Sequence, residues 1–289
     1  MIWLIGNKGM LGTELEELLK KIPRPYLASD REIDITSYDR LFEFAHVKPI
    51  SWIINCAAYT AVDRAEDEPE LAFRLNADGA RHIAAVAAAK HAKLIHISTD
   101  YIFDGSKDAP CCETDDPHPT CVYGASKYQG ERDIADVLAA HFIIRSAWLY
   151  GQHGPNFVTT MLRLFREKNE VQVVADQWGS PTYAGDLAAA ILRIIQADNG
   201  EYGIYHFTNA GRINWHDFAA LIYALARARG LLDHEVSILP VTTAQYPAKA
   251  RRPQYAHLSK DKICLKFNIK LRPWQESLAD FIATLPPAQ

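Results

Sequence analysis

The chain opens with Met1-Ile-Trp-Leu-Ile-Gly-Asn-Lys-Gly-Met-Leu-Gly12, and this stretch decides the fold. Its apolar run has the length of a short buried strand, and the glycines Gly6, Gly9 and Gly12 follow at the spacing G-x-x-G-x-x-G. Residues 13–21 then place leucines at helical spacing. A strand, a glycine-rich turn and a helix in this order begin a doubly wound α/β fold, in which the glycines let backbone N–H groups approach a pyrophosphate. We therefore predict a dinucleotide site here, against the alternative of a glycine-rich turn in another α/β protein.

The composition is that of an ordinary globular protein. The 289 residues are 48% hydrophobic and 23% charged, enough for one large domain or two unequal ones. A net charge of −4 argues against a nucleic-acid groove or a membrane surface. No apolar run approaches membrane-spanning length, and the predicted first strand leaves no room for a signal peptide. The five cysteines contain no C-x-x-C pair, so we expect reduced thiols and a cytoplasmic protein.

Strands and helices alternate through the first half of the chain, which predicts a parallel sheet. The strands expected after the first are residues 25–30, 51–58, 93–97 and 142–145. The helices expected between them are residues 38–46, 69–91 and 123–131. Residues 104–121 contain three prolines and many turn formers, so we expect a long irregular loop there.

Beyond residue 150 this alternation weakens. We expect helices at 156–168, 185–196 and 215–230 and strands at 171–174 and 203–208. The expected organisation is a dinucleotide-binding domain and a smaller, mixed C-terminal substrate lobe. The first takes residues 1–150 with a return segment near 176–208, and the second takes 151–175 and 209–289.

The second predicted strand ends in a charged pair, Asp30-Arg31, 18 positions after Gly12. A carboxylate at this place accepts hydrogen bonds from the adenosine ribose 2′-OH, which favours NAD. The neighbouring Arg31 offers a partner for a 2′-phosphate, which favours NADP. The pair therefore leaves NADH against NADPH open, and Asp30 as a simple turn cap is the plainer alternative.

Tyr123 and Lys127 are four residues apart on a predicted helix, so they share a face. A phenol with its usual pKa near 10 is a poor acid at neutral pH, and a neighbouring ammonium lowers that pKa. Tyr123 can then donate a proton to a carbonyl oxygen as a hydride reaches the carbon. Thr99, at the end of the fourth strand, could bond the same oxygen or the phenol. A surface helix pair is the alternative, and the position of Tyr123 after a strand that ends in Ser-Thr favours the catalytic interpretation.

Three longer motifs in the chain resemble those of a known family. They are Asn55-Cys-Ala-Ala-Tyr-Thr-Ala-Val-Asp63, Ser98-Thr-Asp-Tyr-Ile-Phe-Asp-Gly105 and Val122-Tyr-Gly-Ala-Ser-Lys-Tyr-Gln-Gly-Glu131. With the N-terminal glycines, they resemble the extended short-chain dehydrogenase/reductases and, more narrowly, the dTDP-4-dehydrorhamnose reductase family. The resemblance continues through residues 145–150, 176–183 and 250–253, so it covers nearly the whole chain.

The resemblance implies NADPH- or NADH-dependent reduction of the 4-keto group of dTDP-4-dehydro-L-rhamnose to dTDP-L-rhamnose. It implies that Tyr123 donates the proton, that Lys127 tunes Tyr123 and holds the nicotinamide ribose, and that Thr99 tunes the tyrosine. The cofactor contacts that it implies along the pyrophosphate, the adenosine and the far ribose are Gly9, Met10, Leu11, Asp30, Asp34, Ile35, Ala58, Tyr59 and Thr60.

The resemblance places Thr99, Asp100 and Trp148 against a nucleotide-sugar substrate. Trp148 as a core residue is the alternative. Arg251 or Arg252 could pair with the diphosphate, or the Arg-Arg-Pro loop could be a solvated turn. We expect no metal site, no nucleic-acid partner and no membrane contact, and a homodimer is left open.

Three alternatives share much of this pattern. A sugar-nucleotide 4,6-dehydratase or epimerase usually carries Thr-Asp-Glu, whereas this chain has Thr99-Asp100-Tyr101 and lacks the glutamate base. A reductase of another nucleotide-linked 4-keto-6-deoxy sugar would share every motif. A non-catalytic homologue, such as the regulatory subunit of methionine adenosyltransferase, has this fold, and the retention of Thr99, Tyr123 and Lys127 argues against it.

Overall fold

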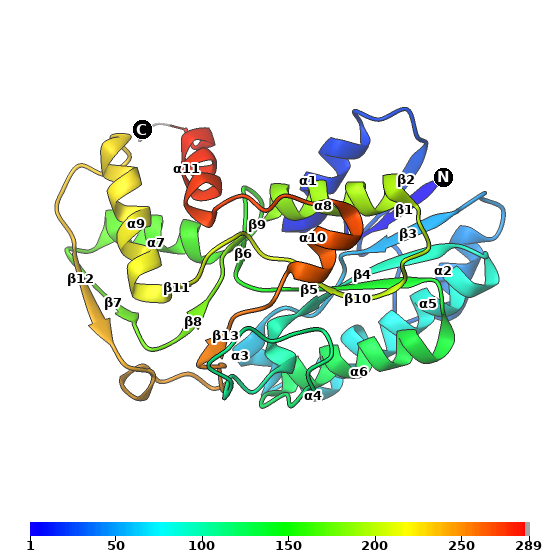
Figure 1. Cartoon of the computed structure of the whole chain (residues 1–289), viewed down its shortest axis with the longest axis horizontal. Helices are drawn as coiled ribbons and strands as arrows, with labels where there is room; N and C mark the ends of the chain where they lie inside the picture. Colours follow the sequence, from blue (N-terminus) through cyan, green and yellow to red (C-terminus); the bar gives the residue numbers. More distant parts are fainter. Residues whose placement is uncertain (287–289) are drawn as a thin grey trace.

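A six-stranded parallel sheet forms the larger part of the computed structural model, which describes residues 1–286 (Figure 1). Its strand order is β10-β5-β4-β3-β1-β2, and every neighbouring pair runs parallel. The strands are β1 (Ile2–Ile5), β2 (Tyr26–Ser29), β3 (Trp52–Asn55), β4 (Lys93–Thr99), β5 (His141–Ser146) and β10 (Gly203–His206). The chain leaves β1 toward β2 and returns to β3 on its other side, so the strand order reverses at β1. The predicted doubly wound α/β fold is confirmed.

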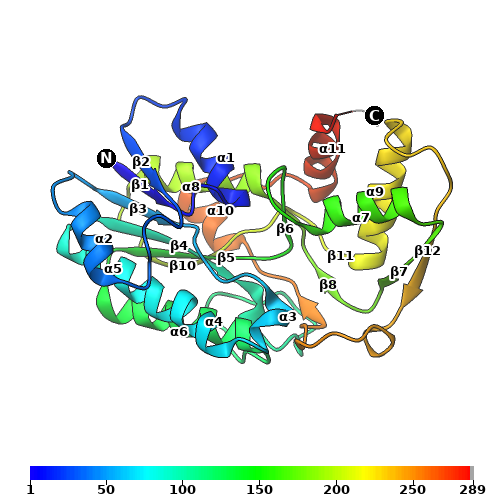
Figure 2. The same cartoon turned by 180° about the vertical axis from the view of Figure 1, so that it is seen from behind.

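Helices cover both faces of this sheet (Figures 1 and 2). One face carries α1 (Met10–Leu19), α8 (Ala184–Ala197) and α10 (Asp261–Phe267), and the other carries α2 (Tyr38–Ala45), α5 (Gly79–Ala89) and α6 (Val122–Val137). In β1, Ile2 and Leu4 pack toward α1 and α8, whereas Trp3 and Ile5 pack toward α2 and α5. Because both faces are buried, the strands are continuous apolar runs.

The C-terminal part, on the left of Figure 1, has its own apolar core. The helices α7 (Phe157–Glu167), α9 (Trp215–Ala228) and α11 (Trp274–Thr284) pack around it. Beside them β7 (Glu170–Val174) pairs in parallel with β12 (Ser237–Val241). The remaining strands are two residues long: β6 (Leu149–Tyr150), β8 (Trp178–Gly179), β9 (Thr182–Tyr183), β11 (Ile213–Asn214) and β13 (Tyr255–Ala256). The predicted residue boundaries of the two domains stay a prediction.

Several predicted elements have different ends in the structure. The helix expected over 69–91 is confirmed as one unbroken helical run that ends at Ala89, and its middle is π-helical: α4 (Pro69–Phe73), a π-helical turn (Arg74–Asp78) and α5. The strand expected over 51–58 stops at Asn55. The N–H of Ala57 donates to the Asn55 side chain and not to a neighbouring strand. The helix expected over 123–131 extends to Val137 as α6.

Three smaller expectations concern the irregular loop, the cysteines and membrane-spanning helices. Within residues 104–121 the structure has no helix or strand, only an isolated bridge from Cys111 to Leu258, so the irregular loop is confirmed. All five cysteines, which lie in the described range, are free. Among residues 1–286 no helix is both long and apolar enough to cross a bilayer.

The turn between β1 and α1 requires glycine at two positions. Gly6 has φ +80°, in the left-handed region. At Gly12 a Cβ atom would lie 2.0 Å from the carbonyl oxygen of Gly6, so only glycine lets the helix come this close to the turn. At Gly9 the nearest atom to such a Cβ is 3.4 Å away, which is ordinary contact.

We predict that Gly12→Ala destabilises the protein by about 1–3 kcal/mol, because a backbone clash cannot be relieved by a side-chain movement. The matched control is Gly9→Ala in the same turn, which should stay within about 0.5 kcal/mol of the parent. Urea unfolding followed by circular dichroism measures both. Equal stability of the two variants would contradict the close approach of α1.

Candidate active site

The predicted dinucleotide site lies at the carboxyl ends of β1, β2 and β3, where the strand order reverses. The first residue before α1, Gly9, is exposed and supplies no side-chain cap. The N–H groups of the first turn of α1 therefore remain available to an anion, and the positive end of the helix dipole favours it. The open space at Gly9 and the glycines beneath it fit a pyrophosphate.

The adenosine end of the predicted site follows β2. Asp30 is partly exposed and Arg31 is exposed, and the N–H of Asp30 donates to Glu32 Oε1 at 2.7 Å. Asp34 accepts hydrogen bonds from Thr36, which lower the pKa of its carboxyl group. Ile35 is buried in the core beneath this edge. The structure thus brings both candidate 2′-site residues to one strand end, and their contacts with a cofactor stay a prediction.

The loop after β3 is held by Asn76, which sequence reasoning left without a role. The Tyr59 N–H donates to Asn76 Oδ1 at 2.8 Å, and Asn76 Nδ2 donates to the Tyr59 carbonyl at 3.1 Å and to Ser126 Oγ at 3.0 Å. Asn76 lies in the π-helical turn, and a Cβ at Gly130 of α6 would come within 2.1 Å of its carbonyl oxygen. This one amide therefore joins the predicted cofactor loop, residues 58–60, to α6.

Tyr123 stands at the start of α6 beside the end of β4. Its ring packs edge-to-face on Tyr101 at 5.5 Å between centroids, and part of its surface is exposed. Burial raises the pKa of the Tyr123 phenol, and the neighbouring Thr99 hydroxyl opposes that rise. The phenol therefore carries its proton at neutral pH, which is the state that a proton donor needs.

Asp100 follows Thr99 and is only 2% exposed. The Thr99 hydroxyl donates to Asp100 Oδ1 at 3.1 Å, and Oδ2 has no hydrogen-bond partner within the described chain. Burial raises the pKa of Asp100 to about 7. The structure thus brings Thr99, Asp100 and Tyr123 together, as predicted for the reacting end of the site.

Lys127 shares the face of Tyr123 on α6 but reaches elsewhere. Its Nζ donates to the Ile97 carbonyl at 2.6 Å and lies 3.1 Å from His96 Nε2, and no hydrogen bond joins these two described residues, Lys127 and Tyr123. The lysine is 2% exposed, and burial lowers its pKa to about 8. The contact with His96 was not predicted from the sequence.

A buried ion pair lies one helical turn further along α6. The Arg145 guanidinium donates to both carboxylate oxygens of Glu131, the shortest contact being 2.6 Å, and each side chain is 2% exposed. Ser98 of β4 also donates to Glu131. Lys127 thus meets β4 at His96 and Glu131 meets it at Ser98, which fixes how α6 lies on the sheet.

Trp148 has an uncommon backbone conformation, with φ +48°. Its indole stacks on Trp215 with ring centroids 3.4 Å apart, and a Cβ at Gly179 would lie 2.6 Å from that indole. Packing on both sides therefore holds this left-handed residue. Trp215, which sequence reasoning missed, lines the cavity described next.

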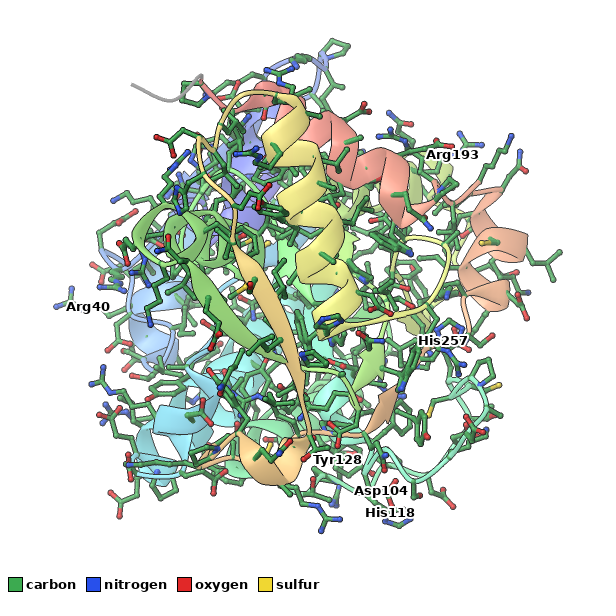
Figure 3. The ribbon with its side chains drawn as sticks, turned by 90° about the vertical axis from the view of Figure 1, so that its left-hand side faces the viewer. Arg40, Asp104, His118, Tyr128, Arg193 and His257 are labelled. Atoms are coloured by element: carbon green, nitrogen blue, oxygen red, sulfur yellow. The ribbon has the colours of Figure 1, made fainter. Side chains whose placement is uncertain are left out.

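A cavity of about 1160 Å³ lies between the sheet and the C-terminal part. Its walls come from residues 101–106, 157–161, 172–177 and 243–254. Tyr101 lines it, so the cavity reaches the aromatic partner of Tyr123. Asp104, which Figure 3 labels together with His118 of the same irregular loop, also lines this cavity.

The two candidate arginines differ in their surroundings. Arg252 lines the cavity, and its guanidinium binds Asp63 with two contacts, 2.6 Å and 3.0 Å. Arg251 also lines the cavity and is exposed. Both arginines therefore line the cavity, and an anion bound at Arg252 would have to share it with Asp63.

Residues 1–286 match the family model described as "RmlD substrate binding domain". The chain belongs to this family. The dTDP-4-dehydrorhamnose reductase of Aggregatibacter actinomycetemcomitans is 41% identical over 286 residues, covering 97% of each chain.

Two solved structures of RmlD-type proteins match the whole fold. The dTDP-4-dehydrorhamnose reductase of Bacillus anthracis in complex with NADP has a TM-score of 0.93 and 38% identity, and the match covers 98% of this chain and 99% of that one. A dTDP-4-dehydrorhamnose reductase of Clostridium acetobutylicum has a TM-score of 0.91 and 37% identity, with 98% of each chain covered. The resemblance predicted from the motifs is confirmed.

For this member of the RmlD family we predict that Asn76→Ala lowers the stability by about 1–3 kcal/mol, because it leaves buried backbone groups of Tyr59 without partners. The control is Asn169→Ala, at an exposed position, which should change the stability by less than about 0.5 kcal/mol. Thermal unfolding compares the two. An unchanged midpoint for Asn76→Ala would show that the loop does not depend on this amide.

Proposed function

We propose that this chain reduces the 4-keto group of dTDP-4-dehydro-L-rhamnose to give dTDP-L-rhamnose, with NADPH or NADH as the reductant. The observation that carries the proposal is the placement of Tyr123 beside Thr99, at the sheet edge that also holds the glycine turn. The coarser prediction, an NADPH- or NADH-dependent oxidoreductase of this family, is confirmed by the relatives.

The chain's residues fit a dinucleotide at the glycine turn, and the bound cofactor would supply a hydride to C4 of the sugar. Tyr123 then gives its phenolic proton to the carbonyl oxygen, so that the ketone becomes an alcohol. Thr99 lies where its hydroxyl can bond the phenol or the same oxygen. In the free protein the Thr99 hydroxyl donates its one hydrogen bond to Asp100 Oδ1, so it can accept from the phenol as it stands and would have to turn away from Asp100 to donate to the substrate oxygen.

The cavity suits a nucleotide-sugar better than a small ketone. Its volume of about 1160 Å³ exceeds the roughly 300–1,000 Å³ of most ligand pockets. Its wall at residues 243–254 includes Lys249, Arg251 and Arg252, which give a diphosphate positively charged partners. Trp215 and Phe157, which pack on each other, add apolar side chains to its wall. The free cysteines support a reducing compartment, and we infer a cytoplasmic enzyme.

The direct test mixes the purified protein with NADPH or NADH and freshly made dTDP-4-dehydro-L-rhamnose, and follows the absorbance of the reduced nicotinamide. Sugar-dependent oxidation and the NMR spectrum of dTDP-L-rhamnose are the expected results. A product with the other configuration at C4 would show that the hydride reaches the opposite face of the same ketone, and would assign the enzyme to the synthesis of another 6-deoxy sugar. Cofactor binding without oxidation would favour a non-catalytic regulatory homologue.

We predict that Tyr123→Phe lowers kcat by roughly 10²-fold or more, because it removes the positioned acid. Tyr128→Phe is the matched control on the same helix, since Tyr128 packs against the separate cluster around Phe103 and Cys111. That variant should stay within about twofold of the parent. The rate of NADPH oxidation at saturating sugar measures both, and a near-normal rate for Tyr123→Phe would remove the proton-donor assignment.

We predict that Arg31→Ala raises the KM for NADPH by about tenfold, because a charge-assisted contact to the 2′-phosphate is lost, and leaves the KM for NADH nearly unchanged. Steady-state kinetics with each cofactor measure the ratio. The control is Arg40→Ala, another exposed arginine near this end of the sheet but on α2. A preference for NADPH that survives Arg31→Ala would exclude a role for Arg31.

A further inference from the structure

A chain of polar side chains runs beneath the active site from β3 through β4 to α6. Asn55 and His96 are register partners on these two strands, and Lys127 reaches them from the helix. All three are at most 2% exposed. None of their mutual contacts is needed to hold the strands, since the backbone ladder already does so.

One backbone N–H group fixes which atom donates and which accepts in each hydrogen bond between these side chains. The N–H of Ala57 donates to Asn55 Oδ1 at 3.0 Å, and a backbone N–H can only donate. The amide of Asn55 is therefore oriented with Nδ2 toward His96 Nδ1, 3.0 Å away. Because Nδ2 is a donor, His96 Nδ1 must supply a lone pair, and the single proton of the neutral ring lies on Nε2.

The Nε2–H of His96 then points at Lys127 Nζ, 3.1 Å away. An ammonium group has three donors and no acceptor, so it cannot receive this hydrogen bond, whereas an amine can accept it through its lone pair. The same nitrogen still donates to the Ile97 carbonyl at 2.6 Å. The observed contacts are therefore satisfied by an uncharged lysine.

The charges around Lys127 do not reverse this conclusion. Glu131 on α6 favours the ammonium, but its carboxylate is taken by Arg145 and Ser98. Cys56, after β3, is a neutral thiol, because burial raises its pKa to about 12. Burial, with a smaller contribution from His141 of β5, holds the pKa of His96 well below its usual value.

We propose that Asn55 and His96 act as positioning residues that favour the uncharged amine of Lys127 in the free protein, so that Lys127 binds its proton more tightly once it leaves His96. The effect on turnover rests on the proposed function, in which a charged Lys127 binds the nicotinamide ribose. The protonation of the free protein does not rest on it. Burial, which lowers the pKa of Lys127 to about 8, acts in the same direction.

The test uses NMR of the ligand-free full chain with ¹³Cε-labelled lysine, in which the Lys127 signal is assigned by its loss in Lys127→Met. We expect Lys127 to bind its proton at least about tenfold more weakly than the exposed lysines do. In a ¹⁵N-histidine spectrum above pH 9, His96 should carry its proton on Nε2. A Lys127 that titrates with the surface lysines, or a His96 with its proton on Nδ1, would overturn the proposal.

The variant Asn55→Asp should reverse the donor and acceptor roles of the two His96 ring nitrogens. Its carboxylate accepts both the Ala57 N–H and a His96 Nδ1–H, so that Nε2 becomes an acceptor for an ammonium. We expect Lys127 to bind its proton about tenfold more tightly or more, and the alkaline fall of kcat/KM to move to higher pH. The charge-matched control is Asn55→Asp with His96→Leu, in which that tightening should be much smaller. Full tightening in the double variant would show that charge alone acts and would exclude His96.

The two proposals fail in different ways. Loss of turnover in the parent protein would remove the proposed function and leave the NMR result standing. If Asn55→Asp does not fold, the His96 proton position in the parent decides the question, because that measurement needs no substitution.

Discussion

The docking of α6 on the sheet is the constraint on which the site depends. Lys127 reaches the β3–β4 pair Asn55 and His96, and Glu131, one turn later, reaches the β4–β5 pair formed by Ser98 and Arg145. Breaking a buried ion pair costs about 3–5 kcal/mol, because the remaining charge has no partner. Any other position of the helix would leave such charges unpaired. The start of α6, and with it the phenol at its first turn, is therefore fixed against the end of β4.

The same helix also connects the reacting end to the cofactor end. Asn76 binds Ser126 of α6 and both backbone groups of Tyr59, and Gly130 allows the close approach that these bonds require. The π-helical turn around Asn76 aims its amide at the loop after β3. A change in this turn would shift α6 and the loop together, since one amide holds both.

The sequence predicted the parallel sheet well because its strands are apolar runs bounded by turn formers, a pattern that local reading detects. It could not show that Asn55 lies beside His96, since 41 residues separate them and only the strand register brings them together. A histidine in an apolar strand usually indicates a satisfied core residue, so His96 gave no signal. Strand β12 was missed because it contains Pro240, which suits an edge strand and breaks the usual pattern. The π-helical turn at 74–78 contains no glycine or proline that would mark it in the sequence.

The segment 246–252 closes one side of the cavity, and its contacts with the sheet domain differ in strength. Lys249 pairs with Asp67, but both side chains are more than half exposed, and such pairs contribute about 0–1 kcal/mol. Arg252 is less exposed and binds Asp63 through two nitrogens, while the N–H of Ala250 donates to the same carboxylate at 3.1 Å. Asp63 is therefore the main attachment point of this segment. An anionic ligand that draws Arg252 into the cavity must weaken that attachment, so the position of the segment and the occupancy of the cavity are linked through one guanidinium.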